Sequence, residues 1–354
     1  MAIVETLSDI TNAGASDIFI IAGLPLTYKI NGNMETYNDS KLMPTETCSL
    51  ITEIYTLAGN RNTDILYNKG DDDFSFALKG VARFRINAYK QRGSLSAVIR
   101  VINFNIPDPS DLEIPENVIH FADLKKGLIL FTGPAGSGKS TSLACMIDHI
   151  NSTRHSHIIT LEDPIEYLHM HKLSIVSQRE IVTDTDSYLT ALRASLRQSP
   201  DVILLGEMRD YETMSVAMTA AETGHLVLST LHTIGASNTI DRIIDAFPPN
   251  QQHQILIQLS MVLQAVISQQ LVPSVDGTLV PAFEIMTMTP AISNMIRESK
   301  IHQIDGQIAS SASLGMISMD ASLLNLFKEG RITEETALSF ASNPELLAKR
   351  LQQF

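Results

Sequence analysis

The chain has 354 residues, which is longer than a typical domain of roughly 100 to 200 residues, so two folded domains are expected. Apolar residues make up 44% and charged residues 18%, which excludes a largely disordered chain. The formal net charge is −13, from 39 acidic and 26 basic residues, and it argues against nucleic acid or anionic lipid as a general partner.

Neither the cysteines nor the apolar segments suggest an extracellular or membrane-inserted protein. Cys48 and Cys145 form no C-x-x-C pair, which fits a reducing compartment. The first residues lack the basic and then apolar order of a secretory signal. The most apolar stretch, 255–272, is interrupted by glutamines. We therefore expect no direct insertion into a membrane.

The first 104 residues predict a mixed α+β domain with an antiparallel sheet. Apolar and polar residues alternate in three predicted strands, at 74–78, 82–88 and 95–102. Asn31-Gly32 predicts a tight hairpin turn after residues 28–30, because both residues tolerate a positive φ. Residues 42–58 have a helical pattern.

Three prolines among acidic residues, at 107, 109 and 115, predict an interdomain linker over 105–118. Apolar runs separated by helix-like segments then follow, at 128–131, 158–161, 202–205 and 226–228. This pattern is typical of a parallel sheet that is buried on both faces. We expect an α/β nucleotide-binding core over 119–289 and a helical region over 290–354.

A glycine-rich loop stands between the predicted strand 128–131 and a helix-like segment at 140–150. Residues 133–140 read GPAGSGKS and match the pattern G-x-x-x-x-G-K-[ST]. In such a loop, backbone N–H groups converge on phosphate oxygens, Lys139 reaches the β and γ phosphates, and Ser140 offers a hydroxyl to Mg²⁺. ATP and Mg²⁺ are the expected ligands. The predicted nucleotide contacts are Pro134, Ala135, Gly136, Ser137, Gly138, Lys139, Ser140 and Thr141.

Two carboxylates follow predicted strands of the same sheet. Glu162 ends the strand at 158–161, and Glu207 follows the strand at 202–205. Both would project from the carboxyl edge, where phosphates bind in such sheets. Carboxylates at strand ends also serve as helix caps. Next to a phosphate loop, however, they are candidates for orienting the attacking water and for holding the metal.

His225 and His232 lie at either end of the predicted strand 226–228. A histidine near a core strand is usually a hydrogen-bonded structural residue. The position of the pair beside the nucleotide sheet also fits a sensor of the γ phosphate. No third ligand stands at the spacing of a metal site. The structural and the sensing interpretation both remain open.

Arg83 and Arg85 lie two positions apart on a predicted strand and therefore share its polar face. They are either part of a solvated sheet surface or an arginine pair presented to a transferring phosphate. Arg100, on the following predicted strand, is a third candidate.

Four sequence boxes occur in an order that resembles the secretion ATPase superfamily and, within it, the type IV pilus retraction ATPases. They are the phosphate loop, the acidic box at 162–166, the Walker B segment at 206–210 and the histidine box at 224–233. Residues 14–17, 22–25 and 80–85 resemble the N-terminal domain of this family. The resemblance implies an α/β chain with an N-terminal PAS-like α+β domain, a RecA-like P-loop ATPase domain and a helical C-terminal part.

The resemblance also implies roles for individual residues. Glu162 would be the catalytic base, and Glu207 would support Mg²⁺ together with Ser140, partly through water. His225 and His232 would sense the nucleotide. The remaining three, Arg83, Arg85 and Arg100, would approach the nucleotide when the N-terminal domain closes over it.

For the whole protein, the resemblance implies a homo-hexameric motor at the cytoplasmic face of the inner membrane. ATP turnover would drive pilus disassembly through an inner-membrane platform protein. Two cysteines are too few for the four-cysteine zinc insert of extension motors. Residues 291–298 resemble the retraction signature AIRNLIRE, with Ser293 and Met295 as departures.

Other functions remain open alternatives. One is a related secretion-system motor or an accessory pilus ATPase. A second is a nucleotide-gated regulatory module that hydrolyses ATP too slowly to do mechanical work. A DNA motor is disfavoured by the net charge and by the lack of a basic stretch that contains aromatic residues.

Overall fold

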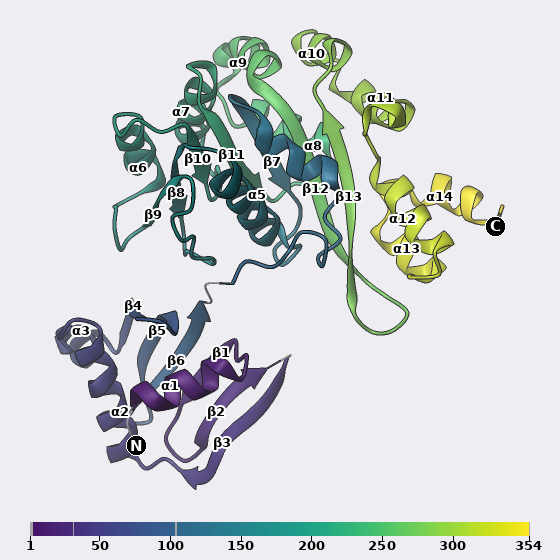
Figure 1. The fold of residues 1–354 in the computed structure, drawn as a ribbon. Helices are drawn as coiled ribbons and strands as arrows, with labels where there is room; N and C mark the ends of the chain where they lie inside the picture. The colour runs from purple at the N-terminus through teal and green to yellow at the C-terminus, as the bar shows by residue number, and fades with distance from the viewer. Residues whose placement is uncertain (1–2, 31, 103–104, 354) are drawn as a thin grey trace. The chain divides into compact units, whose positions relative to one another are not determined.

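The computed structural model describes residues 3–30, 32–102 and 105–353, and the chain forms two compact units (Figure 1). The N-terminal unit comprises Met1–Asn105 and Glu166–Leu168. The C-terminal unit comprises Ile106–Ile165 and His169–Phe354. Among the described residues, no helix is both long enough and apolar enough to cross a membrane.

The N-terminal unit is built on a six-stranded antiparallel sheet in the order β3-β2-β1-β6-β5-β4. Its strands are β1 Asp17–Ile20, β2 Pro25–Ile30, β3 Asn33–Lys41, β4 Asp71–Leu78, β5 Ala82–Gln91 and β6 Ser94–Ile102. Its helices are α1 Ile3–Asn12, α2 Pro44–Leu57 and α3 Asp64–Lys69. The three strands and the helix predicted for this part of the chain are confirmed.

The predicted hairpin after residue 30 joins β2 and β3, which pair in antiparallel register from Ile30 opposite Asn33. Residue 31 of the predicted Asn31-Gly32 turn lies outside the described residues. Alternation along β5 sets its two faces. Phe84 and Ile86 are fully buried, whereas Arg83 and Arg85, which alternate with them, are half-buried on the opposite face.

The C-terminal unit contains a seven-stranded sheet in the order β13-β12-β7-β11-β10-β8-β9. The strands are β7 Gly127–Thr132, β8 His157–Glu162, β9 Ile175–Glu180, β10 Val202–Leu205, β11 Leu226–Leu231, β12 Leu263–Pro273 and β13 Leu279–Thr287. Only β13 runs antiparallel to its neighbour. The four predicted strands and the predicted fold class are confirmed, and β9, β12 and β13 are additional strands.

Helices cover both faces of this sheet (Figure 1). The helices of this unit are α4 Glu116–His120, α5 Lys139–Thr153, α6 Tyr188–Ser195, α7 Tyr211–Glu222, α8 Ala236–Asp245, α9 Pro249–Val262, α10 Pro290–Arg297, α11 Ile304–Ser310, α12 Met319–Lys328, α13 Glu334–Phe340 and α14 Pro344–Leu351, of which the last three pack on the far ends of β12 and β13. Short 3-10 turns are η1 Phe121–Asp123, η2 Ile301–Gln303 and η3 Ala312–Leu314. Along β7, Ile129 and Phe131 pack toward α5, and Leu128 and Leu130 pack toward α7, α8 and α9.

Most of the segment predicted as a linker packs on the C-terminal unit. Apolar side chains from this segment join the core on the α5 side of the sheet, namely Ile106, Leu112, Ile114 and Val118. Prolines prevent regular structure here, but the apolar side chains between them still have surface to bury. The division of the chain into domains at the expected positions stays a prediction.

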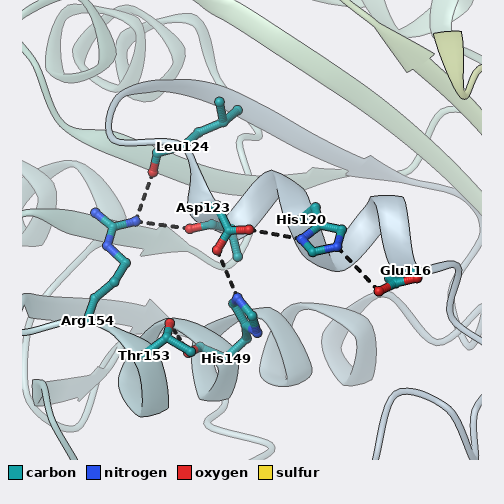
Figure 2. Close-up of polar contacts among 8 residues, drawn as sticks. Glu116, His120, Asp123, Leu124, His149, Thr153 and Arg154 are labelled. Atoms are coloured by element: carbon teal, nitrogen blue, oxygen red, sulfur yellow. Dashed lines mark hydrogen bonds and ion pairs between the residues drawn. The ribbon is translucent and has the colours of Figure 1, made fainter.

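A carboxylate fixes the segment before β7 to the far end of α5 (Figure 2). The two oxygens of Asp123 lie 3.0 Å from His120 Nδ1 and 2.9 Å from His149 Nε2. The hydrogen bond with Asp123 raises the pKa of His120. Arg154, just after α5, donates to the carbonyl oxygens of Ala122 and Leu124. The helix that follows the phosphate loop is thereby held at its C-terminal end.

A buried histidine follows β8 and is connected to the strand end that carries Glu162. The backbone N–H of His169 donates to Gln178 Oε1 at 2.8 Å, and Gln178 Nε2 donates to Glu162 Oε1 at 3.3 Å. The His169 residue is only 9% exposed, and its Nδ1 atom has no hydrogen-bond partner among the described residues. Burial lowers the pKa of His169 to about 4, from an ordinary value of 6.5.

We predict that His169 makes the protein acid-sensitive between pH 6.5 and about 4. In this window the unfolded chain binds a proton at residue 169 that the folded chain excludes, so stability falls as the pH falls. The total loss is about 3 kcal/mol, and His169→Leu should remove this slope. Urea unfolding followed by circular dichroism at several pH values measures it.

His155→Gln is the matched control, because that imidazole is exposed in the same unit. The control should keep the wild-type slope of stability against pH. An unchanged slope in His169→Leu would show that the buried ring is not the source of the acid sensitivity.

Candidate functional site

The phosphate loop connects the end of β7 to the start of α5. Gly138 precedes the helix with a left-handed φ of 87°, which glycine adopts without strain. Lys139 is buried, and its Nζ donates to the carbonyl oxygens of Gly133 and Pro134, both at 2.8 Å. The lysine ammonium therefore lies against the loop itself, where the two carbonyl oxygens stabilise its positive charge.

The loop offers the features that a phosphate ligand requires. Pro134, Ala135, Gly136 and Ser140 are exposed, and Thr141 is half-buried. The hydroxyl oxygen of Ser137 is buried without a hydrogen-bond partner in the part of the chain that the structure describes. Backbone N–H groups at a helix N-terminus attract anions. The geometry thus fits a bound nucleotide phosphate.

The pairing of the parallel strands brings the ends of β11, β10 and β8 to the same edge as this loop. The strands β7, β11, β10 and β8 are consecutive neighbours and parallel. Thr132 pairs with Leu231, and Leu205 pairs with both Ser229 and Leu161. Because parallel strands end at the same edge, the residues that follow these strands lie at the same edge of the sheet.

Glu207 lies in a pocket of about 540 Å³ at this edge. It forms an ion pair with Arg209, and its Oε2 lies 3.4 Å from His232 Nε2. Burial raises the pKa of Glu207, but the bond and charge of Arg209, with a smaller effect of His232, hold the pKa below its usual value. The pocket is lined by Glu207, Met208, Arg209, Thr230, Leu231, His232, Thr233 and Arg242.

Glu162 ends β8 at the same edge. Its Oε1 accepts hydrogen bonds from Thr160 Oγ1 at 2.6 Å and from Gln178 Nε2 at 3.3 Å. These bonds orient the carboxylate without neutralising it. The structure thus brings Glu162, Glu207 and His232 to the same edge of the sheet as the phosphate loop.

The structure does not bring His225 to this edge. The residue precedes β11 at the amino edge, where its carbonyl accepts a bond from Gly127 N at 3.0 Å. Its Nδ1 lies 2.9 Å from the carbonyl oxygen of Ala220. The six residues of β11 separate His225 from His232, a distance of roughly 20 Å. Within one chain, only His232 can contact a nucleotide at the phosphate loop.

The three candidate arginines lie together on one face of the N-terminal sheet. Arg85 pairs directly across the strands with Arg100, and Arg83 is two positions away on β5. Each contacts a residue of the same sheet: Arg83 with Ser75 at 2.6 Å, Arg85 with Asp73 at 2.8 Å and Arg100 with Asp17 at 3.2 Å. They belong to a different unit from the phosphate loop, so a role at the nucleotide stays a prediction.

The segment that resembles the retraction signature forms α10. Ser293 donates its hydroxyl to the carbonyl oxygen of Ser260 in α9 at 2.9 Å, and Arg297 Nη2 donates to the Ser293 hydroxyl at 3.4 Å. The serine that departs from the signature is therefore used in packing α10 on α9.

Gln269 is a neighbour of the phosphate loop that the motif analysis did not identify. It lies on β12, is 4% exposed, and accepts a hydrogen bond from the hydroxyl of Ser142 in α5 at 2.8 Å. The available signal was the polar run Ser268, Gln269 and Gln270 inside an otherwise apolar stretch. Buried polar side chains in a core strand require partners.

Comparison with known proteins shows the family of the chain. The family model described as "Type II/IV secretion system protein" matches residues 1–309. The type IV pilus retraction ATPase PilT of Pseudomonas aeruginosa is 44% identical over 98% of this chain and 99% of its own length. The type IV pilus ATPase PilU of the same organism is 41% identical over 93% of this chain and 86% of its own length.

A solved structure extends the likeness to the fold. The crystal structure of the pilus retraction motor PilT with bound ADP superposes with a TM-score of 0.89 and 45% identity, covering 99% of each chain. The chain described here belongs to the type II/IV secretion system protein family.

Proposed function

We propose that this protein is an ATP-hydrolysing motor that drives the retraction of type IV pili. The main support is that the phosphate loop, Glu162, Glu207 and His232 are at one sheet edge, in a chain that is 44% identical to a pilus retraction ATPase over nearly its full length. The residues at the sheet edge support ATP binding and hydrolysis. The sequence identity to a pilus retraction ATPase supports pilus retraction as the process that hydrolysis drives.

The substrate in this proposal is ATP, bound through residues 134–141. Binding would turn Lys139 Nζ from the carbonyl oxygens of Gly133 and Pro134 to the phosphates. Glu162, held by Thr160 and Gln178, would orient and deprotonate the attacking water. His232 would report the γ phosphate to Glu207, which it already contacts.

Mg²⁺ is the metal that this site would take. The Ser140 hydroxyl and the Glu207 carboxylate are hard oxygen donors, which suit Mg²⁺, and no group of three or more acidic, histidine or cysteine ligands occurs among the described residues. Mg²⁺ typically keeps several waters and the substrate phosphates as ligands, so few protein ligands suffice. When bound, the ion neutralises charge on the transferring phosphoryl group.

The motor would work as a homo-hexamer in the cytoplasm, at the inner face of the membrane, through an inner-membrane platform protein. Arg83, Arg85 and Arg100 would approach the nucleotide when the N-terminal unit moves. Guanidinium groups stabilise the charge that develops during phosphoryl transfer, which gives such a movement a catalytic consequence.

Lys139→Ala tests the nucleotide chemistry. Without the ammonium, turnover of Mg-ATP should fall about 100-fold or more, because charge on the β and γ phosphates is no longer stabilised. Phosphate release by the purified protein measures turnover. Lys126→Ala, which removes an exposed lysine of the same unit, should keep the wild-type rate. Undiminished hydrolysis by Lys139→Ala would refute the assignment of the phosphate loop.

The number of pili on the cell surface tests whether the protein drives pilus retraction. Cells that lack the protein should carry more surface pili than cells that contain it, and those pili should not shorten, because assembly continues without retraction. Fluorescently labelled pili followed on live cells measure number and shortening together. Cells without pili would indicate an extension motor instead.

A second candidate function is that of an accessory pilus ATPase, favoured by the 41% identity to the type IV pilus ATPase PilU. Under that function, pili of the deletion strain would still shorten. A turnover below about 10⁻³ s⁻¹ would instead favour a nucleotide-gated module, since enzymes typically turn over at about 1 to 10³ s⁻¹.

A further inference from the structure

The phosphate loop is supported from a strand that carries none of the sequence motifs. Gln269 of β12 follows Ser268, which pairs with Thr132 at the end of β7. Gln269 therefore lies where the phosphate loop begins. It is 4% exposed, and its Oε1 accepts the hydroxyl hydrogen of Ser142, itself 1% exposed, at 2.8 Å. Both partners of this bond are removed from water, so losing either one leaves a buried polar group unpaired.

Gln269 also touches the loop at two glycines. A Cβ atom on Gly133 would lie 2.2 Å from the carbonyl oxygen of Gln269, and a Cβ atom on Gly138 would lie 2.8 Å from its Nε2. Gly133 and Gly138 have φ values of 137° and 87°. The backbone of the loop thus approaches Gln269 more closely than any side chain would allow, at its first and its sixth residue.

The alternation of β12 separates Gln269 from its equally buried neighbours. Ser268 faces the other side of the sheet, where its hydroxyl accepts a bond from Gly235 N at 3.0 Å. Gln270, 5% exposed, also points there and donates from Nε2 to the carbonyl oxygen of Phe340 at 3.3 Å. Only Gln269 of this polar run contacts the phosphate loop and α5.

We propose that Gln269 is a positioning residue for nucleotide binding. Its backbone carbonyl and its amide group hold the two ends of the phosphate loop, and its bond to Ser142 fixes α5 relative to β12. The backbone N–H groups of the loop are thereby set before a nucleotide arrives, so less ordering is needed on binding. This inference rests on the proposed nucleotide site.

Gln269→Leu tests the proposal, because leucine keeps most of the volume and removes the amide. The dissociation constant for ADP, measured by titration calorimetry on the full-length protein, should rise about three- to tenfold, the value of one side-chain hydrogen bond. KM for ATP should rise by a similar factor with kcat nearly unchanged, as expected when binding alone is weakened. Gln270→Leu is the matched control and should keep the wild-type constants.

Ser142→Ala provides a second, smaller change at the same bond. It should weaken ADP binding by a similar or smaller factor, because Gln269→Leu also removes the amide beside Gly138. The double variant should bind no more weakly than Gln269→Leu, which already lacks the bond to Ser142. Additive losses, or wild-type ADP affinity in both single variants, would overturn the proposal. Thermal melting of each variant shows whether it is folded. If Gln269→Leu does not fold, Ser142→Ala still tests the proposal.

The outcomes separate this inference from the function on which it rests. If the wild-type protein binds no ADP, the proposed nucleotide site fails. If it binds ADP and the Gln269→Leu and Ser142→Ala variants bind equally well, the site stands and only the role of Gln269 is contradicted.

Discussion

The parallel register of four neighbouring strands is the constraint on which the candidate site depends. In the order β7-β11-β10-β8, each strand ends at the same edge, so residues far apart in the sequence become neighbours. The buried side chains of β7, β10 and β11 fix that register, because a shift would expose apolar surface on both faces. The carboxylates and His232 are thus placed by core packing rather than by local loop structure.

The phosphate loop and the neighbouring strand ends also set the surroundings of the charged groups at this edge. A buried ammonium is costly unless polar groups surround it, and the Gly133 and Pro134 carbonyls supply that environment for Lys139. Phosphate oxygens are stronger partners for an ammonium than neutral carbonyls are. At the neighbouring strand ends, Arg209 and His232 keep Glu207 ionised, which suits a metal-supporting carboxylate.

Features that follow from local sequence patterns could be predicted from the sequence, whereas features that depend on tertiary packing could not. The phosphate loop, the alternating strands of the first unit and the four apolar strands follow from local patterns. By contrast, β12 was hidden in an apolar stretch that begins as α9, and β9 carries the polar sequence IVSQRE at the edge of the sheet. Spacing also could not tell which end of β11 meets the phosphates, and this decides between His225 and His232.

The most direct measurement is a crystal structure of the protein with Mg²⁺ and an ATP analogue that is not hydrolysed. Phosphate oxygens should lie among the N–H groups of residues 134–141, with Lys139 Nζ moved from its two carbonyl partners to the phosphates. Glu207 and Ser140 should face the metal, directly or through water. A nucleotide bound elsewhere, or Lys139 still donating to Gly133 and Pro134 with phosphates in the loop, would contradict the proposed role of the phosphate loop in ATP binding.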